Sequence, residues 1–307
     1  MGRLTKRGAV LRLDGAGRSG ARDTVVAEEP LEIRVGGRQT AVTMRTPGDD
    51  FDLVAGYLVG EGVVRAREQL AAMRFCDHAS CAGLPGEAGA ADLGDLPELH
   101  DLHDPYNVVE VELAAGVAPP SWSMDRTTYT TSACGVCGKT SIAAVRANAH
   151  WSVESDALRI APETLYGLPA AMREHQRLFE KTGGLHAAGL FAADGRLLCL
   201  REDVGRHNAV DKVVGWALRE DRLPLRGCVL TVSGRASFEL VQKAAAAGIP
   251  VLAAVSAPSS LAVELAEAAG LTLIGFLRGH TANVYSHAER ITEDGCAVGS
   301  EAAVGAL

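Results

Sequence analysis

The chain has 307 residues, of which 47% are hydrophobic and 22% charged. It can therefore bury a sizeable core, and its composition lies outside the range of disordered proteins. The net charge is −8, but residues 75–125 hold ten acidic residues and no Lys or Arg, so the rest of the chain sums to about +2. The near-neutral charge outside residues 75–125 is compatible with an anionic ligand. It does not provide the basic surface that is typical of proteins that bind duplex nucleic acid.

Seven cysteines are too few for a disulfide-stapled secreted domain of this length, which favours reduced thiols and a cytoplasmic location. Charged residues interrupt every apolar run near the N-terminus, so no secretion signal is predicted. One uncharged run, residues 244–263, is long enough to cross a membrane. Because it contains two prolines and changes period midway, it predicts a helix end, a buried strand and a helix start.

The first half predicts a small α+β domain over residues 23–125. Residues 1–22 are basic, glycine-rich and aperiodic, and we expect flexible tails there and over residues 293–307. Between the tails, the elements predicted for the first half are a hairpin around Gly36 and Gly37, a helix from about Asp50 to Gly60, an acidic loop over residues 76–104 and a strand that begins near Tyr106.

The second half, residues 126–292, has the alternation of helices and strands that is typical of an α/β domain. A helix over residues 162–181 and a hairpin around Gly195 come first. Helices and apolar strands then alternate, with strands at residues 228–232, 249–254 and 271–276. This pattern predicts a mostly parallel sheet with helices on both faces, and ligands bind such sheets beyond the carboxyl ends of the strands.

Cys134 and Cys137 form a C-x-x-C motif with a glycine after each cysteine and a lysine close by. A helix is predicted to follow. Thiols at a helix N-terminus beside a cation have a lowered pKa, so this pair is a candidate nucleophile for sulfur exchange. The alternative is a structural zinc site that these cysteines share with Cys76, His78 and Cys81.

Polar segments follow three consecutive predicted strands, and each lies where backbone N–H groups can meet an anion. They are residues 233–237, residues 258–260 and residues 276–281. A fourth segment, residues 201–212, places Arg206 and His207 at the positive end of a predicted helix, where the alternative is a solvated helix start. Together they predict an anion-binding edge.

These motifs resemble the FdhD family of formate dehydrogenase accessory sulfurtransferases over about residues 24–292. The resemblance is carried, in one order along the chain, by C-G-V-C-G-K, T-G-G-L-H-A-A, E-D-V-G-R-H-N-A-V-D-K, S-G-R-A-S-F-E-L-V-Q-K and G-F-L-R-G-H-T-A-N-V-Y. It implies a cytidine-deaminase-like core, in the C-terminal half, and a homodimer. It also implies that sulfane sulfur passes from a cysteine desulfurase, through a cysteine persulfide, to the molybdenum of the bis-molybdopterin guanine dinucleotide cofactor of formate dehydrogenase.

The resemblance also implies residue roles. It matches Cys134 to the persulfide cysteine and Cys137 to its partner. Its cofactor-binding stretch matches Phe276, Leu277, Arg278, Gly279, His280 and Thr281. From the strand and helix ends we add Ser233, Gly234, Arg235, Arg206, His207 and Asp203, the last as a partner for a guanine edge, with a guanine nucleotide such as GDP as the expected mimic.

Two other functions stay open on the sequence alone. A zinc deaminase would share the implied fold but needs H-x-E followed later by P-C-x-x-C. Here His186 is followed by Ala187 and Ala188, and Ala133 precedes Cys134. A non-catalytic chaperone would bind the molybdenum cofactor while its cysteines hold zinc. We expect no bound metal, no nucleic-acid partner and no membrane insertion.

Overall fold

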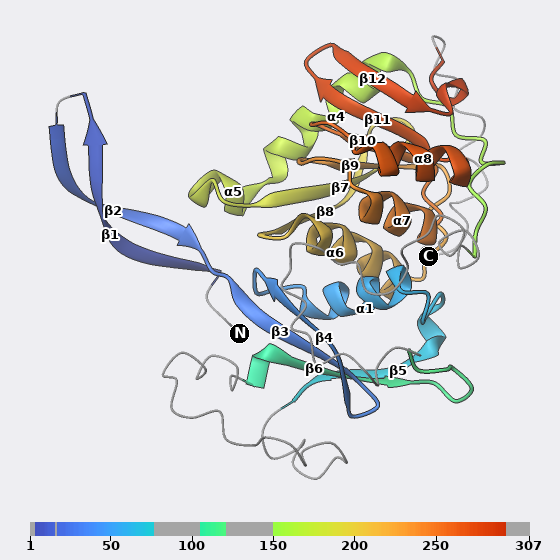
Figure 1. The fold of residues 1–307 in the computed structure, drawn as a ribbon, viewed down its shortest axis with the longest axis horizontal. Coiled ribbons are helices and arrows are strands. Elements are labelled where there is room, and N and C mark those ends of the chain that lie inside the picture. Colours follow the sequence, from blue (N-terminus) through green and yellow to red (C-terminus); the bar gives the residue numbers. More distant parts are fainter. Residues whose placement is uncertain (1–3, 16, 77–104, 121–149, 293–307) are drawn as a thin grey trace.

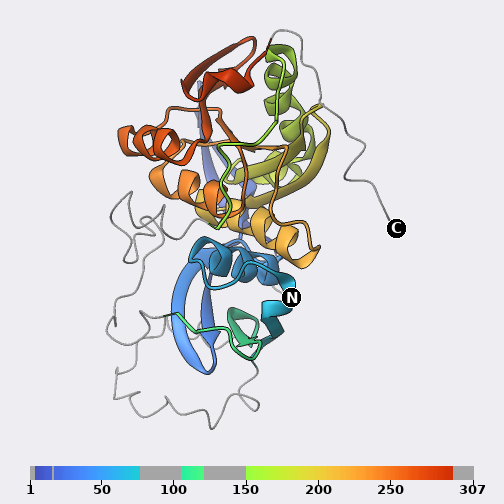
Figure 2. The same ribbon diagram turned by 90° about the vertical axis from the view of Figure 1, so that its right-hand side faces the viewer.

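The computed structural model describes residues 4–15, 17–76, 105–120 and 150–292, and these form two large sheets with helices between them and a separate two-stranded sheet (Figure 1). Figure 2, turned by 90°, shows α1 (Asp50–Gly60) and α6 (Arg206–Arg219) stacked between the sheets. The expected two-part α/β architecture is confirmed. The predicted acidic loop, the predicted helix after the C-x-x-C motif and the expected C-terminal tail lie outside the described residues.

The first sheet has the strand order β4-β3-β6-β5 and packs on α1. Its strands are β3 (Glu29–Val35), β4 (Arg38–Arg45), β5 (Leu70–Phe75) and β6 (Val108–Leu113). The predicted hairpin joins β3 to β4 through Gly36 and Gly37, which both adopt positive φ, at 57° and 77°. Two consecutive left-handed residues are typical of a tight hairpin turn, and glycine adopts them without strain. Strand β5 was not predicted. Short 3-10 helices precede β5 and β6, at Arg67–Gln69 and Pro105–Asn107.

The second sheet has the order β12-β11-β10-β9-β7-β8. Its strands are β7 (His186–Ala192), β8 (Leu197–Asp203), β9 (Cys228–Val232), β10 (Val251–Ala254), β11 (Thr272–Arg278) and β12 (Thr281–Ser286). Strands β9, β10 and β11 run parallel, and the other three pairings are antiparallel. The expectation of a mostly parallel sheet therefore holds for the central strands only, because hairpins form both edges.

Helices cover both faces of this sheet, as predicted. Alternate residues of the central strands face two different cores. On one face, Leu230 and Leu252 pack towards α6, α7 (Phe238–Ala246) and α8 (Ser260–Ala269). On the other face, Val229 and Val251 pack towards α4 (Pro162–His175). The helix predicted over residues 162–181 is two helices. It breaks at the buried Gln176, and α5 (Arg177–Thr182) begins in a new direction. A last 3-10 turn spans Ala288–Arg290.

The N-terminal segment differs from the expected tail. Strands β1 (Thr5–Asp14) and β2 (Gly17–Val26) pair along ten residues and form a sheet of their own, which projects from the body (Figure 1). No strand was predicted here because neither face of this hairpin is packed on a core, so the usual alternation of apolar and polar residues is weak. We call residues 4–26 the arm.

No helix among the described residues is long and apolar enough to cross a membrane. The uncharged run at residues 244–263 forms the end of α7, strand β10 and the start of α8, as predicted.

Two glycines bring the backbones of α1 and α6 into contact. A Cβ added to Gly56 would overlap the main-chain carbonyl of Asp211, and one added to Gly215 would lie 2.6 Å from the main-chain nitrogen of Gly56. Any side chain at either position would push the helices apart. Apolar residues of both sheets and both helices form one continuous core around this contact, so the two predicted domains share their core.

The substitution Gly56→Ala should destabilise the protein by about 1–3 kcal/mol, because the added methyl group meets backbone that cannot rotate away. Gly167→Ala in α4 is the matched control, since an added Cβ there meets no heavy atom within 4 Å. It should be neutral or stabilise by up to about 1 kcal/mol. Urea unfolding of both variants measures the difference, and equal midpoints would contradict the close helix contact.

Candidate functional site

Five chain segments meet on the side of the second sheet where the parallel strands β9, β10 and β11 have their carboxyl ends. We call this surface the rim. The segments are His186, residues 203–207, residues 233–237, residues 255–260 and residues 276–281. Three of them follow the parallel strands β9, β10 and β11. Because β7 runs antiparallel to β9 and β8, its first residue, His186, lies at the same edge, opposite Asp203. The structure thus brings together the polar segments that the sequence singled out.

Main-chain hydrogen bonds connect the loops of the rim. The Ser256 N–H donates to the Gly234 carbonyl at 3.3 Å, and the Ser259 N–H donates to the Ala236 carbonyl at 3.0 Å. The Phe276 N–H in turn donates to the Ser256 carbonyl at 3.2 Å. The three strand ends therefore form one bonded surface, and a ligand that touches one loop is positioned relative to the others.

Helices α6, α7 and α8 all begin at the rim. The hydroxyl of Ser259 caps α8 by accepting from the Ala262 N–H at 3.3 Å. The N-caps of α6 and α7, Gly205 and Ser237, make no such side-chain cap. The first N–H groups of a helix without a cap carry partial positive charge and favour an anion.

The side chains of His207 and Arg206 lie beside these helix ends. His207 Nε2 lies 3.2 Å from the Ser237 hydroxyl and 3.5 Å from the Glu239 carboxylate. The hydrogen bond from His207 lowers the pKa of Glu239 to about 2, so this carboxylate is ionised. The Nε of Arg206 is inaccessible and has no hydrogen-bond partner among the described residues. A buried donor of this kind is costly unless a partner arrives.

His186 was missed as a binding candidate by the sequence analysis, which examined it only as a zinc ligand. Its ring is half-buried and packs beside Gly234, where an added Cβ would lie 3.2 Å from Nδ1. Burial, followed by the charges of Arg206 and His207, lowers the pKa of His186, so its ring is neutral at pH 7. A neutral imidazole can both donate and accept hydrogen bonds. The antiparallel direction of β7 could have identified His186, because it brings the first residue of this strand to the rim.

The segment of residues 276–281 places an aromatic ring and a cation at the far end of the rim. Phe276 is 39% exposed and adopts a positive φ of 53° at a bulge between β11 and β12. The Arg278 guanidinium lies 5.8 Å from the Phe276 ring centre, and its Nε donates to the Val255 carbonyl at 2.8 Å. His280 is exposed and meets Tyr166 edge to face. Leu277, in contrast, is a core residue, so its side chain is not offered to a ligand.

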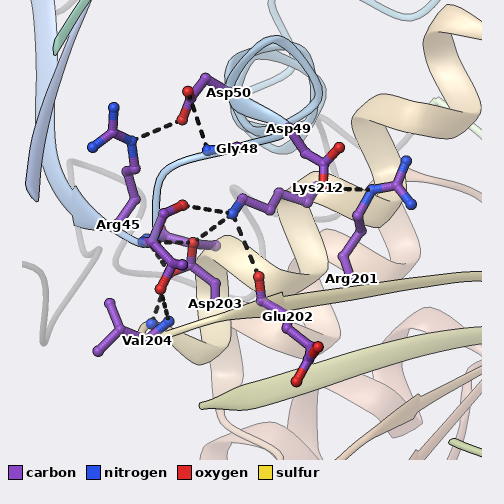
Figure 3. Close-up of polar contacts among 12 residues, drawn as sticks. Arg45, Gly48, Asp49, Asp50, Arg201, Glu202, Asp203, Val204 and Lys212 are labelled. Carbon is purple, nitrogen blue, oxygen red and sulfur yellow. Dashed lines mark hydrogen bonds and ion pairs between the residues drawn. The ribbon is translucent and has the colours of Figure 1, made fainter. Parts of the chain in front are cut away.

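The expected role of Asp203 in binding a guanine edge does not fit the structure. Its carboxylate has no exposed surface and already accepts four hydrogen bonds or ion pairs (Figure 3). Lys212 Nζ lies 2.8 Å away, and the other donors are the N–H groups of Thr46 and Gly205 and the side-chain amide of Asn208. Asp203 therefore positions the start of α6 from within the protein.

Cys134 and Cys137, the predicted sulfur-handling pair, lie outside the described residues. The buried Cys199 and Cys228 do not replace them, because burial raises the pKa of Cys199 to about 12 and that of Cys228 to about 11. Both thiols are therefore poor nucleophiles. Within the described parts of the chain, no group of three or more His, Cys, Asp or Glu residues is placed to hold a metal ion.

Comparison with known proteins agrees with the motifs. The model of the FdhD/NarQ family matches residues 26–292. The "Sulfur carrier protein FdhD" of Streptomyces coelicolor is 53% identical over 95% of this chain and 97% of its own, and that of Mycolicibacterium paratuberculosis is 54% identical over 94% and 99%.

A crystal structure from Desulfotalea psychrophila, of a protein described as an accessory protein of formate dehydrogenase, shares the fold. It has a TM-score of 0.69 and 23% identity, and the match covers 94% of this chain and 100% of that one. The match to the family model and the identity to these relatives show that the chain belongs to the FdhD/NarQ family.

Proposed function

We propose that this protein is a sulfur carrier in formate dehydrogenase maturation. It takes sulfane sulfur from a cysteine desulfurase as a persulfide on Cys134 and passes it to the molybdenum of the bis-molybdopterin guanine dinucleotide cofactor, which binds as a substrate. The observation that carries the proposal is the 53% identity, over 95% of the chain, to a protein named as a sulfur carrier. The donor and the formate dehydrogenase are the proposed partners.

The loading step needs only thiol chemistry. The Cys134 thiolate attacks the outer sulfur of the donor persulfide, the bond between the two donor sulfurs breaks, and the donor cysteine leaves as a thiolate. Cys134 then holds the sulfur as a persulfide, without any net oxidation or reduction. Cys137, three residues away, acts after loading, in relay or resolution.

The rim is suited to the phosphates and guanines of the cofactor. Helix starts without side-chain caps and the nearby Arg206 favour phosphate groups. The exposed Phe276 ring and Arg278 beside it provide an aromatic face and a cation, a combination on which a guanine base can stack. Ser233, Gly234 and Arg235 lie between these two regions on the bonded loops.

A zinc deaminase is the weaker candidate. The glutamate that shuttles protons in those enzymes stands two residues after the histidine. Here that position is Ala188, which is buried in the core of the sheet. A non-catalytic chaperone differs from our proposal in one measurable property, because it would not take up sulfur.

The substitution Cys134→Ala should abolish both sulfur loading and formate dehydrogenase activation. Intact mass after incubation with a cysteine desulfurase and cysteine measures loading, as the gain of one sulfur. Cys137→Ala should still load but transfer poorly, because its role follows loading. Normal loading and activation by the Cys134 variant would contradict the assignment, and an unloaded wild-type protein would favour the chaperone.

The substitutions Arg235→Ala and Arg278→Ala should weaken GDP binding about tenfold to over a hundredfold, since each lost charged hydrogen bond costs about 1.5–3 kcal/mol. Isothermal calorimetry measures the affinity. Arg196→Ala is the control, because this exposed arginine lies in the β7–β8 turn at the opposite edge of the sheet. Sulfur loading should be unchanged in all three variants. Unchanged GDP affinity in both rim variants would place the ligand elsewhere.

GDP should raise the pKa of His186, because phosphate charge beside the ring stabilises its protonated form against the burial and the neighbouring cations that lower it now. Histidine resonances in NMR spectra, assigned with a His186→Gln variant, measure the titration with and without GDP. His150 is the control, since its neighbour Trp151 packs near Gly248 at the opposite edge of the sheet. Equal shifts at both histidines would show that the effect is not local.

A further inference from the structure

The five segments of the rim carry three arginines and one acidic residue, Asp203. The arginines are Arg206, Arg235 and Arg278. The carboxylate of Asp203 has no exposed surface and pairs with Lys212 Nζ at 2.8 Å, so it presents no negative charge to a ligand. An anion that approaches these segments therefore meets cations and the positive ends of helices.

Glu239, two residues after Ser237, changes this balance. The helices α6, α7 and α8 all begin at the rim, and of these three only α7 has an acidic residue in its first turn, which is Glu239. A carboxylate in this position is stabilised by the positive end of its own helix. The side chain of Glu239 is 17% exposed, so a ligand on the rim meets its charge.

The Glu239 carboxylate is held by groups of the kind that bind phosphate. His207 Nε2 lies 3.5 Å from it and 3.2 Å from the Ser237 hydroxyl. Hydrogen bonds from His207, from the main-chain N–H of Glu239 itself and from the Ser237 hydroxyl outweigh burial and lower its pKa to about 2. A ring N–H, a hydroxyl and a first-turn N–H are also donors to phosphate oxygens. Glu239 is thus an anion that the protein supplies to its own anion site.

A ligand phosphate competes with this carboxylate. The Nε2 atom of His207 carries a single proton, so it cannot donate fully to Glu239 and to a phosphate at the same time. The side chains of His207 and Glu239 are only 14% and 17% exposed, and like charges in a partly buried site repel each other more strongly than they do in water. The rim should therefore bind phosphate less tightly than its cations alone would allow.

The packing of α7 on α6 does not depend on Glu239. One turn further along the two helices, Lys243 pairs with the buried Asp211 at 2.7 Å. Leu240 and Val241 of α7 are also completely buried in the core. Because these contacts hold the helix in place, a change of charge at Glu239 can be tested without loss of the fold.

We propose that Glu239 limits the affinity of the rim for phosphate groups, so that the cofactor leaves once it has received sulfur. The role assigned to Glu239 rests on the proposed function, because it takes the rim as the cofactor site. A carrier binds the cofactor as a substrate and must release it. Cations without an opposing charge would hold the phosphates longer, since differences in affinity between related complexes arise mostly from the dissociation rate.

The substitution Glu239→Gln removes the charge and keeps the shape of the side chain. It should tighten GDP binding about tenfold, measured by calorimetry, because a like charge beside the phosphates is lost. Guanosine has no phosphate, so its affinity for the two proteins should agree within about threefold. The gain for GDP should shrink as salt rises from about 0.05 M to about 0.5 M.

Two further variants separate charge from structure. Glu239→Asp keeps the charge, so its GDP affinity should stay within about threefold of the wild-type value. Glu163→Gln removes a charge from the first turn of α4. This helix begins at the opposite end of the strands, where Thr164 lies beside Gly195 of the β7–β8 turn. Glu163→Gln should leave the GDP affinity unchanged.

The dissociation rate tests the role in release. A fluorescent GDP analogue should leave the Glu239→Gln variant about tenfold more slowly than it leaves the wild-type protein, measured by stopped flow. A gain in affinity that came wholly from faster association would overturn the role in release.

The other outcomes are equally decisive. Equal or weaker GDP binding by Glu239→Gln would overturn the proposal, because a purely structural role for Glu239 predicts a loss. An equal gain for guanosine would also overturn it, since no phosphate is involved. If the wild-type protein binds GDP and the variant shows no gain, only the role of Glu239 fails. If neither protein binds GDP, the cofactor site of the proposed function fails with it.

Discussion

The buried ion pair between Asp203 and Lys212 is the constraint on which the arrangement of the rim depends. A charged pair without access to water is stable only when its remaining hydrogen-bonding positions are filled. Here the main chain of Thr46 supplies an N–H to the carboxylate and a carbonyl to the ammonium group, at 3.1 Å and 2.9 Å. The pair therefore ties the end of β8, helix α6 and the segment before α1 into one unit, and it fixes where α6 begins.

The motif E-D-V-G-R-H-N-A-V-D-K performs two tasks because it changes from strand to helix within a few residues. Asn208, Asp211 and Lys212 are buried, and Asn208 bonds to the Met44 carbonyl while Asp211 pairs with Lys243 at 2.7 Å. Arg206 and His207, on the first turn, remain at the rim. One run of polar residues thus holds the two sheets together and supplies positive charge to the site.

The sequence was most informative where apolar patterns were strong. Strand β9 begins and ends as predicted, and the meeting of strand ends on one side of the sheet followed from the alternation of strands with helices. The hairpin strands β1, β2 and β12 were missed because most of their residues are exposed, so they lack a clear alternation of apolar and polar side chains. Asp203 was wrongly predicted to bind the ligand, because a sequence does not show which polar side chains are buried.

Neighbouring carboxylates at the end of β8 point to opposite faces of the sheet, as successive strand residues must. Asp203 faces α6, whereas Glu202 accepts from the N–H groups of Leu178 and Phe179 at 3.0 Å and 2.8 Å and so caps α5. The two acids therefore fix the pairing register of β8. A slip of one residue would exchange the faces, leaving Lys212 without its carboxylate and α5 without its cap, so incorrect pairing of β8 is penalised on both sides at once.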